Sequence, residues 1–153
     1  MFTKKKTDFA SIADGEVIPL EAVNDSVFSS KMLGDGFAVR LMDNKIYSPI
    51  KGKVKSVFPT KHAIYLVDAL GNDILLHIGL DTVELNGEGF TIFVKEDQKV
   101  PQGSLLAEID RELIEKKYKK DTTSMVIITN NKQTMRLRPG IVKHGEVIGS
   151  IDK

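Results

Sequence analysis

The chain has 153 residues, of which 22 are basic and 21 acidic, so its formal net charge is +1. A chain of this length usually forms one domain, and a charge so close to zero provides no basic field that would hold nucleic acid. The hydrophobic fraction of 41% and the charged fraction of 28% are those of an ordinary globular protein. They exclude the disordered, collagen-like and coiled-coil classes for most of the chain.

Two absences narrow the classes further. The sequence contains no cysteine, so it has no disulfide framework, no thiolate zinc site and no cysteine nucleophile, and we expect a reducing, cytoplasmic location. The longest uninterrupted apolar run, residues 63–67, is far shorter than the roughly 18 residues that a membrane helix needs. We therefore expect no membrane span.

The first residues are polar and contain three consecutive lysines at positions 4–6. This composition predicts a flexible N-terminal tail at residues 1–13, followed by a single domain at residues 14–153. The alternative is a short membrane-touching helix that uses Phe2, Phe9 and Ile12 together with the lysines.

After this segment the sequence consists of short runs rich in Ile, Val, Leu and Phe, separated by glycine and proline. Such runs predict strands, and the absence of long helices between them favours an all-β, antiparallel sandwich or barrel over a parallel α/β sheet. The predicted strands are residues 17–20, 38–42, 53–57, 63–67, 73–78, 90–94, 105–109, 125–129 and 146–151.

Two helical segments are expected. Residues 111–120 carry pairs of opposite charge at i,i+4 spacing, such as Glu112 with Lys116, and Asp110 is placed to cap their N-terminus. Residues 25–31 predict a shorter helical turn.

Three histidines are the side chains best suited to chemistry at neutral pH. His62 opens one predicted strand and His77 closes the next, with a turn at residues 68–72 between them. An even-numbered loop would place the two side chains opposite each other on one face, and an odd-numbered loop would place them on opposite faces. Thr60 lies two residues before His62, where its hydroxyl could orient the ring. His144 lies in a predicted exposed turn and is not expected to be a site residue.

Several motifs resemble glucose-type enzyme IIA domains of the bacterial phosphoenolpyruvate-dependent sugar phosphotransferase system. The most specific is residues 71–83 (GNDILLHIGLDTV). Supporting segments occur in family order: residues 27–36 (VFSSKMLGDG), 47–52 (YSPIKG), 58–63 (FPTKHA), 83–90 (VELNGEGF) and 103–110 (GSLLAEID). The resemblance covers residues 14–152.

The resemblance implies a small antiparallel β-sandwich that accepts a phosphoryl group from the histidine-containing phosphocarrier protein and passes it to an enzyme IIB domain. In this comparison His77 matches the phosphorylated histidine, His62 the second active-site histidine, and Thr60 the hydroxyl residue near it. No cofactor or metal is implied. The enzyme IIB partners place the protein's work at the inner face of the membrane.

The resemblance also implies a docking face. Phe28, Phe58 and Leu75 match an apolar collar, with Leu75 where some members of the family have phenylalanine. Asp35, Asp81 and Asp110 match acidic positions around that collar.

Two other functions remain open at this point. A regulatory module could bind transporters or kinases through the histidine face in a phosphorylation-dependent way. A zinc hydrolase would need three protein ligands, for which His62, His77 and Asp81 are the candidates.

Overall fold

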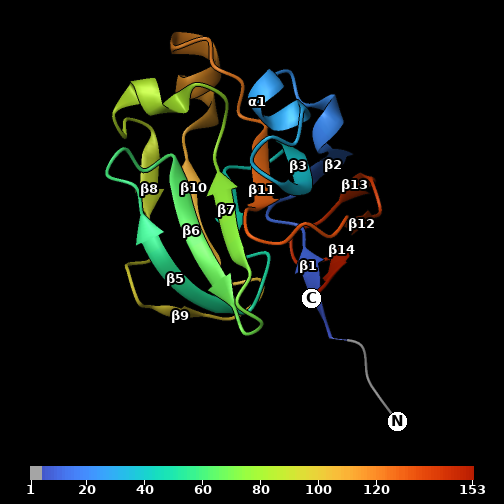
Figure 1. The fold of residues 1–153 in the computed structure, drawn as a ribbon. Helices are drawn as coiled ribbons and strands as arrows, with labels where there is room; N and C mark the ends of the chain where they lie inside the picture. The colour runs from blue at the N-terminus through green and yellow to red at the C-terminus, as the bar shows by residue number, and fades with distance from the viewer. Residues whose placement is uncertain (1–4) are drawn as a thin grey trace.

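The computed structural model describes residues 5–153, and these residues form 14 strands, one short α-helix and three other helical turns (Figure 1). All strand pairs are antiparallel. The all-β architecture expected from the sequence is therefore confirmed.

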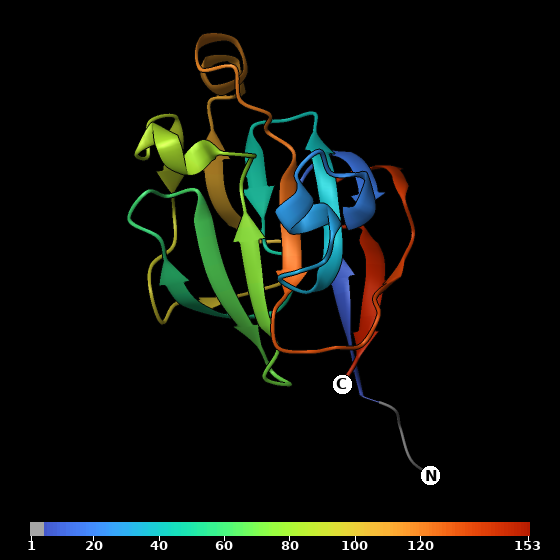
Figure 2. The ribbon, with the colours of Figure 1, turned by 45° about the horizontal axis from the view of Figure 1, so that its top comes forward.

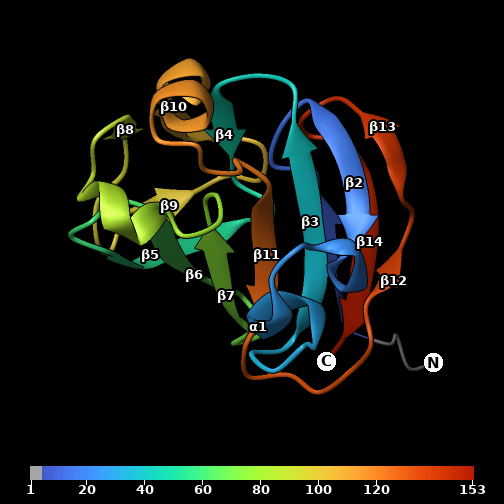
Figure 3. The same cartoon turned by 90° about the horizontal axis from the view of Figure 1, so that it is seen from above.

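The largest sheet consists of β2 (Gly15–Pro19), β3 (Asp35–Leu41), β5 (Gly52–Val57), β6 (Ala63–Asp68), β7 (Asp73–His77), β9 (Lys99–Val100), β11 (Ser124–Ile128) and β13 (Gly140–Val142). Their order across the sheet is β13-β2-β3-β11-β7-β6-β5-β9. Seen from above, these strands follow one another around the molecule, which gives the sheet its barrel-like curvature (Figure 3).

Two small sheets complete the fold. One consists of β1 (Lys6–Ala10), β12 (Arg136–Leu137) and β14 (Val147–Asp152), and the other of β4 (Lys45–Tyr47), β8 (Phe90–Ile92) and β10 (Leu105–Ile109). The main hydrophobic core combines buried side chains of all three sheets, for example Phe9, Ile46, Leu76 and Val126. This shared core makes the sheets layers of a sandwich.

The middle of the large sheet is buried on both faces. A second apolar cluster on its outer face combines Phe28, Leu75, Met125 and Ile127 with other small apolar side chains. Phe28 comes from helix α1 (Ser26–Ser29), which lies in front of β3 and β11 (Figure 2). Because both faces are covered, β11 is buried at every position and its sequence shows no polar alternation.

Nine strands overlap the runs that the sequence predicted. The sequence pattern did not predict five strands, and all of them but β1 have only two or three residues: β1, β4, β9, β12 and β13. So short a strand has no measurable hydrophobic periodicity, and its position is set by pairing with a neighbour.

The predicted flexible tail is wrong for residues 6–13. Strand β1 pairs with β14, and Phe9 and Ile12 have no exposed surface. These two side chains are therefore part of the core and cannot anchor a membrane-touching helix. Phe2 and Lys4 lie outside the described residues. A register shift between Phe9 and Ala10 interrupts the strand's alternation, which is why the pattern gave no strand signal.

The two predicted helical segments form, and both are shorter than predicted: α1 ends at Ser29 instead of residue 31. Asp25 caps α1 by accepting a hydrogen bond from the amide of Val27 at 2.9 Å. Asp110 caps the second segment through the amide of Leu113 at 3.1 Å. That segment ends in a π-helical turn at Leu113–Lys117, three residues earlier than predicted. Among residues 5–153, no helix is long and apolar enough to cross a membrane.

Candidate functional site

The hairpin formed by β6 and β7 brings the two predicted histidines together. His77 ends β7 and lies opposite Ala63, the first residue of β6. The side chains of Ala63 and His77 therefore point to the outer face of the sheet, where Ala63 and Leu75 belong to the second apolar cluster.

The two histidine side chains share one face, as one of the two alternatives predicted, but not because the loop is even-numbered. The loop between the paired residues Val67 and Asp73 has an odd length, and His62 precedes the strand, with its carbonyl accepting a hydrogen bond from the amide of Ile78. The ring centroids of His62 and His77 are nevertheless only 5.0 Å apart. Lys61 has a left-handed backbone, with φ of 62°, and this turn breaks the strand alternation just before His62.

The hydrogen bond of His77 fixes its tautomer. Nδ1 lies 2.9 Å from the carbonyl oxygen of Gly79. Because a carbonyl oxygen only accepts, Nδ1 must donate a proton, and the neutral ring keeps its lone pair on Nε2. Burial lowers the pKa of His77 to about 4, with a smaller contribution from the charge of His62 in the same direction. His77 is therefore neutral at pH 7, and its Nε2 is available as a nucleophile.

The lowered pKa of His77 predicts a pH dependence of folding stability. The folded ring stays neutral between its pKa of about 4 and the ordinary value of 6.5, whereas the unfolded chain takes up a proton in this range. Because the unfolded state binds more protons in this range, the free energy of unfolding increases as the pH rises from 4 to 6.5. As the pH falls from 6.5 to 4, the protein loses roughly 2 to 3 kcal/mol of stability.

Urea denaturation of the wild type and of His77→Gln across this pH range measures the effect. We expect a clearly smaller slope for the variant, because only the remaining groups, His62 among them, then titrate. If the free energy of unfolding changed with pH equally in both proteins, His77 could not be a buried neutral residue in the folded state.

Gly79 is required by the backbone that holds His77. Its φ is 80°, and a Cβ at this position would lie 2.5 Å from Cγ2 of Thr82 and 3.1 Å from the carbonyl oxygen of Asp121. Both the left-handed conformation and the crowding exclude a larger residue.

We predict that Gly79→Ala lowers the free energy of unfolding by about 2 to 4 kcal/mol. Gly71→Ala is the matched control, because Gly71 has a similar φ of 84° but a Cβ added there would meet no atom within 4 Å. It should cost only about 1 kcal/mol of backbone strain. Chemical denaturation of both variants decides, and equal losses would show that crowding at Gly79 has no effect.

His62 is positioned by the hydroxyl that the sequence analysis assigned to it. Oγ1 of Thr60 lies 2.7 Å from Nδ1 of His62, and the imidazole is almost fully buried. Burial lowers its pKa as well. When the threonine donates to Nδ1, the neutral ring carries its proton on Nε2 and can donate it to a group bound at His77.

The predicted apolar collar surrounds the pair. The Phe28 ring lies 4.9 Å from the His77 ring, and the Phe58 ring lies 5.6 Å from the His62 ring in an edge-on arrangement. Leu75 is buried on the same face. Tyr65, which the sequence analysis did not identify, packs 6.1 Å from Phe58. The collar removes water from around both imidazoles, which strengthens any electrostatic interaction made there.

Of the three predicted acidic residues, Asp81 acts on the histidine pair. It follows the Gly79 turn with a left-handed φ of 57°, and its charge partly offsets the lowering of the His77 pKa by burial. Asp25 has the same effect. From the sequence, Asp25 was expected only at the start of a helical turn, because nothing in its local sequence shows that α1 lies against His77.

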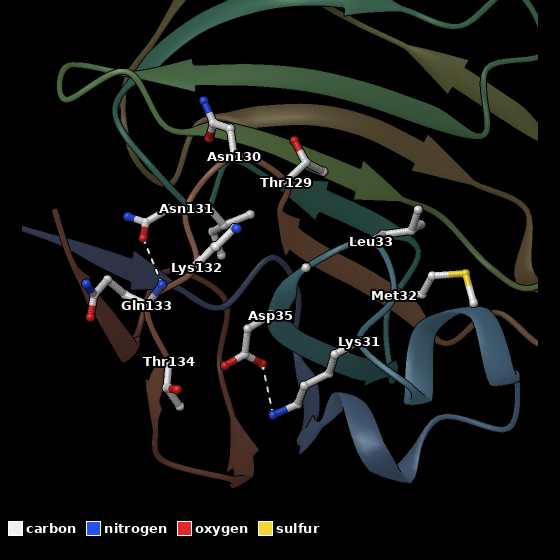
Figure 4. Close-up of a pocket in the computed structure, with 12 residues that line it drawn as sticks. Lys31, Met32, Leu33, Asp35, Thr129, Asn130, Asn131, Lys132, Gln133 and Thr134 are labelled. Carbon is white, nitrogen blue, oxygen red and sulfur yellow. Dashed lines mark hydrogen bonds and ion pairs between the residues drawn. The ribbon is translucent and has the colours of Figure 1, made fainter.

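Asp35 and Asp110 are not brought to the histidine pair. The Asp35 carboxylate accepts hydrogen bonds from the amides of Gly36 and Met135 and pairs with Lys31 at 3.4 Å. It lies beside a separate pocket of about 520 Å³ between residues 31–35 and 128–134 (Figure 4). Asp110 caps the helical turn described above. Both carboxylates have structural partners that explain their presence.

The remaining predictions concern metal binding and His144. Within residues 5–153, no three His, Asp or Glu side chains are grouped so that they could hold a metal ion. The ligand set that a zinc hydrolase would need is therefore not assembled by His62, His77 and Asp81. His144 lies in an exposed turn, as predicted, and its ring stacks on Tyr47 with the centroids 3.9 Å apart.

Known proteins resemble this chain over most of its length. Residues 7–134 match the family described as phosphoenolpyruvate-dependent sugar phosphotransferase system, EIIA 1. Among solved structures, the chain is similar to the glucose permease IIA from Mycoplasma capricolum, with 41% identity, a TM-score of 0.91 and coverage of 98% of each chain. The resemblance recognised in the sequence is confirmed, and the chain belongs to this enzyme IIA family as a phosphoryl carrier of the sugar phosphotransferase system.

Proposed function

We propose that His77 is the residue that carries the phosphoryl group, through its Nε2 atom. The single observation that supports this assignment best is the hydrogen bond from Nδ1 to the carbonyl oxygen of Gly79 at 2.9 Å. It leaves the lone pair on Nε2, and burial keeps the ring neutral near pH 7. A neutral imidazole with one anchored nitrogen presents the other nitrogen in a fixed direction, as an in-line transfer requires.

In the proposed transfer no proton has to be added to or removed from His77. The Nε2 lone pair of His77 forms a new N–P bond while the N–P bond of the phosphocarrier protein breaks, and the electrons of that bond return to the donor nitrogen. In the second step the Nε2–P bond breaks, its electrons stay on Nε2, and the phosphorus bonds to the nucleophile of enzyme IIB. The proton on Nδ1 of His77 stays in place throughout.

His62 has the supporting role in this proposal. Its ring lies 5.0 Å from that of His77, and the hydroxyl of Thr60 holds its Nδ1. An N–H at Nε2 can then bind the phosphoryl oxygens and stabilise the charge that spreads over them during transfer. The collar of Phe28, Phe58 and Leu75 excludes water and so protects the phosphorylated ring from hydrolysis.

The phosphorylated protein also supports a regulatory use of the same face. With the proton on Nδ1 retained, phosphorylation adds a net charge of about −1 on a face where Phe28 and Leu75 are apolar and Asp81 is acidic. Transporters or kinases that bind this face would then distinguish the two forms. We place these partners, together with the donor and the enzyme IIB acceptor, in the cytoplasm at the inner face of the membrane.

Mass spectrometry and NMR test the assignment of the carrier atom. The protein, labelled with ¹⁵N-histidine, is incubated with phosphoenolpyruvate, enzyme I and the phosphocarrier protein. We expect one acid-labile phosphoryl group and a ³¹P–¹⁵N coupling to Nε2 of His77. A coupling to His62, or to Nδ1 of His77, would refute the proposed assignment.

A further inference from the structure

Asp25 places a carboxylate beside the ring that covers His77. It caps α1 through the amide of Val27 at 2.9 Å, and Phe28, three residues later, lies 4.9 Å from the His77 ring. Asp25 and Phe28 therefore lie at the same end of α1, and the charge of Asp25 acts on the His77 ring, whose pKa it raises against the lowering by burial.

In the described part of the chain, no cation pairs with the Asp25 carboxylate. Among residues 5–153, its side chain makes one hydrogen bond, to its own helix, and no ion pair. The nearby Lys31 pairs with Glu21 and Asp35 instead. Asp81 differs, because Lys120, which binds Glu84, also interacts with its charge. Asp25 is thus the carboxylate near His77 whose charge is not offset.

The charge of Asp25 affects the two states of His77 differently. A neutral imidazole has no net charge to repel, whereas the phosphorylated ring, which keeps its proton on Nδ1, carries a net charge of about −1, the phosphoryl oxygens being negative and the ring positive. Two like charges at a given separation repel more strongly as the local dielectric falls, and the dielectric is low beside the apolar collar. The phosphorylated form is therefore raised in free energy relative to the free form, and the repulsion disappears when the phosphoryl group leaves.

We propose that Asp25 sets the phosphoryl-transfer equilibrium of this protein, by repelling the phosphoryl group on His77 and so favouring its passage to enzyme IIB. The proposal rests on His77 being the carrier residue. In this proposal Asp25 acts only through its charge and does not contact the reacting atoms. A carboxylate that only contacted a partner would change the rate of transfer, but it would not change the equilibrium constant between the separated proteins.

Asp25→Asn isolates the charge, because asparagine caps a helix as well as aspartate. The equilibrium constant for phosphoryl exchange with the phosphocarrier protein is measured from the amounts of both phosphorylated proteins by ³¹P NMR. We expect Asp25→Asn to shift it roughly 3- to 10-fold toward the phosphorylated form of this protein. The shift should shrink at high salt, which screens exposed charges, and Asp25→Glu should retain the wild-type value.

Asp43→Asn is the matched control. Asp43 also accepts a hydrogen bond from a nearby backbone amide, that of Asn44 at 2.7 Å, in the turn between β3 and β4, and its variant should leave the equilibrium unchanged. An Asp25→Asn protein with the wild-type equilibrium constant and an altered rate would overturn the proposal in favour of partner docking. If the wild type takes up no phosphoryl group, the assignment of His77 as the carrier is wrong. This result differs from an unchanged equilibrium constant in Asp25→Asn, which would refute only the role of Asp25.

Discussion

The variant His77→Gln should take up no phosphoryl group in the complete transfer system. Removal of the nucleophile leaves no lone pair at the position of Nε2, and we expect the rate of phosphorylation to fall by more than about 10⁴-fold. The glutamine amide can still donate a hydrogen bond to the carbonyl of Gly79, so the loop after β7 should keep its conformation. Intact mass after incubation with phosphoenolpyruvate, enzyme I and the phosphocarrier protein measures the result.

The fold of His77→Gln is the necessary control for this experiment. Circular dichroism and a cooperative thermal transition establish that the variant is folded. A folded variant that still gains one acid-labile phosphoryl group would show that another residue is the carrier, and His62, the other imidazole of the pair, would become the candidate. A variant that gains none while the wild type gains one would support the assignment of His77.

The variant His62→Ala should accept the phosphoryl group but transfer it poorly. His77 keeps its hydrogen bond to Gly79 and its nucleophilic Nε2, whereas the N–H that stabilises the phosphoryl oxygens during transfer is lost. Removal of one such donor typically costs a factor of about 10² to 10³. Quenched-flow measurement of transfer to enzyme IIB, starting from the isolated phosphorylated protein, gives the rate.

Thr60→Val provides the graded comparison for His62→Ala. Valine has nearly the shape of threonine but cannot bond to Nδ1 of His62, so the ring keeps its place in the collar and loses its orientation. We expect a loss of about 10-fold, smaller than that of His62→Ala, as is usual when an orienting partner is removed. An onward rate in His62→Ala equal to that of the wild type would contradict the stabilising role of His62.

Local sequence patterns predicted more of the histidine site than of the elements that pack around it. The turn residues 68–72 and the apolar strands on either side predicted the β6–β7 hairpin, and His62 and His77 were identified at its open end. Asp25 and Asp110 were expected at the starts of helical turns, and both are caps. These features depend on a few consecutive residues, whose conformational preferences act before any distant contact forms.

The structural contacts that local sequence did not reveal share a different cause. Strand β1 is polar at Lys6 and Asp8 and is defined by its pairing with β14 at the other end of the chain. Asp35 occurs in a motif typical of the family, yet its carboxylate is held by the amide of Met135, 100 residues away in sequence. Neither contact leaves a local signal, because each depends on which segments meet when the sheets pack.

Local sequence was enough to identify the family, the antiparallel β architecture and the two candidate imidazoles, because motif spacing and apolar runs are properties of neighbouring residues. How those imidazoles meet depends on the folded chain. A left-handed turn at Lys61 brings His62 to the face of His77, and lysine seldom adopts this conformation. Packing of α1 against the sheet places Phe28 on the His77 ring and brings Asp25 with it, since burial of that apolar face depends on strands far away in the chain.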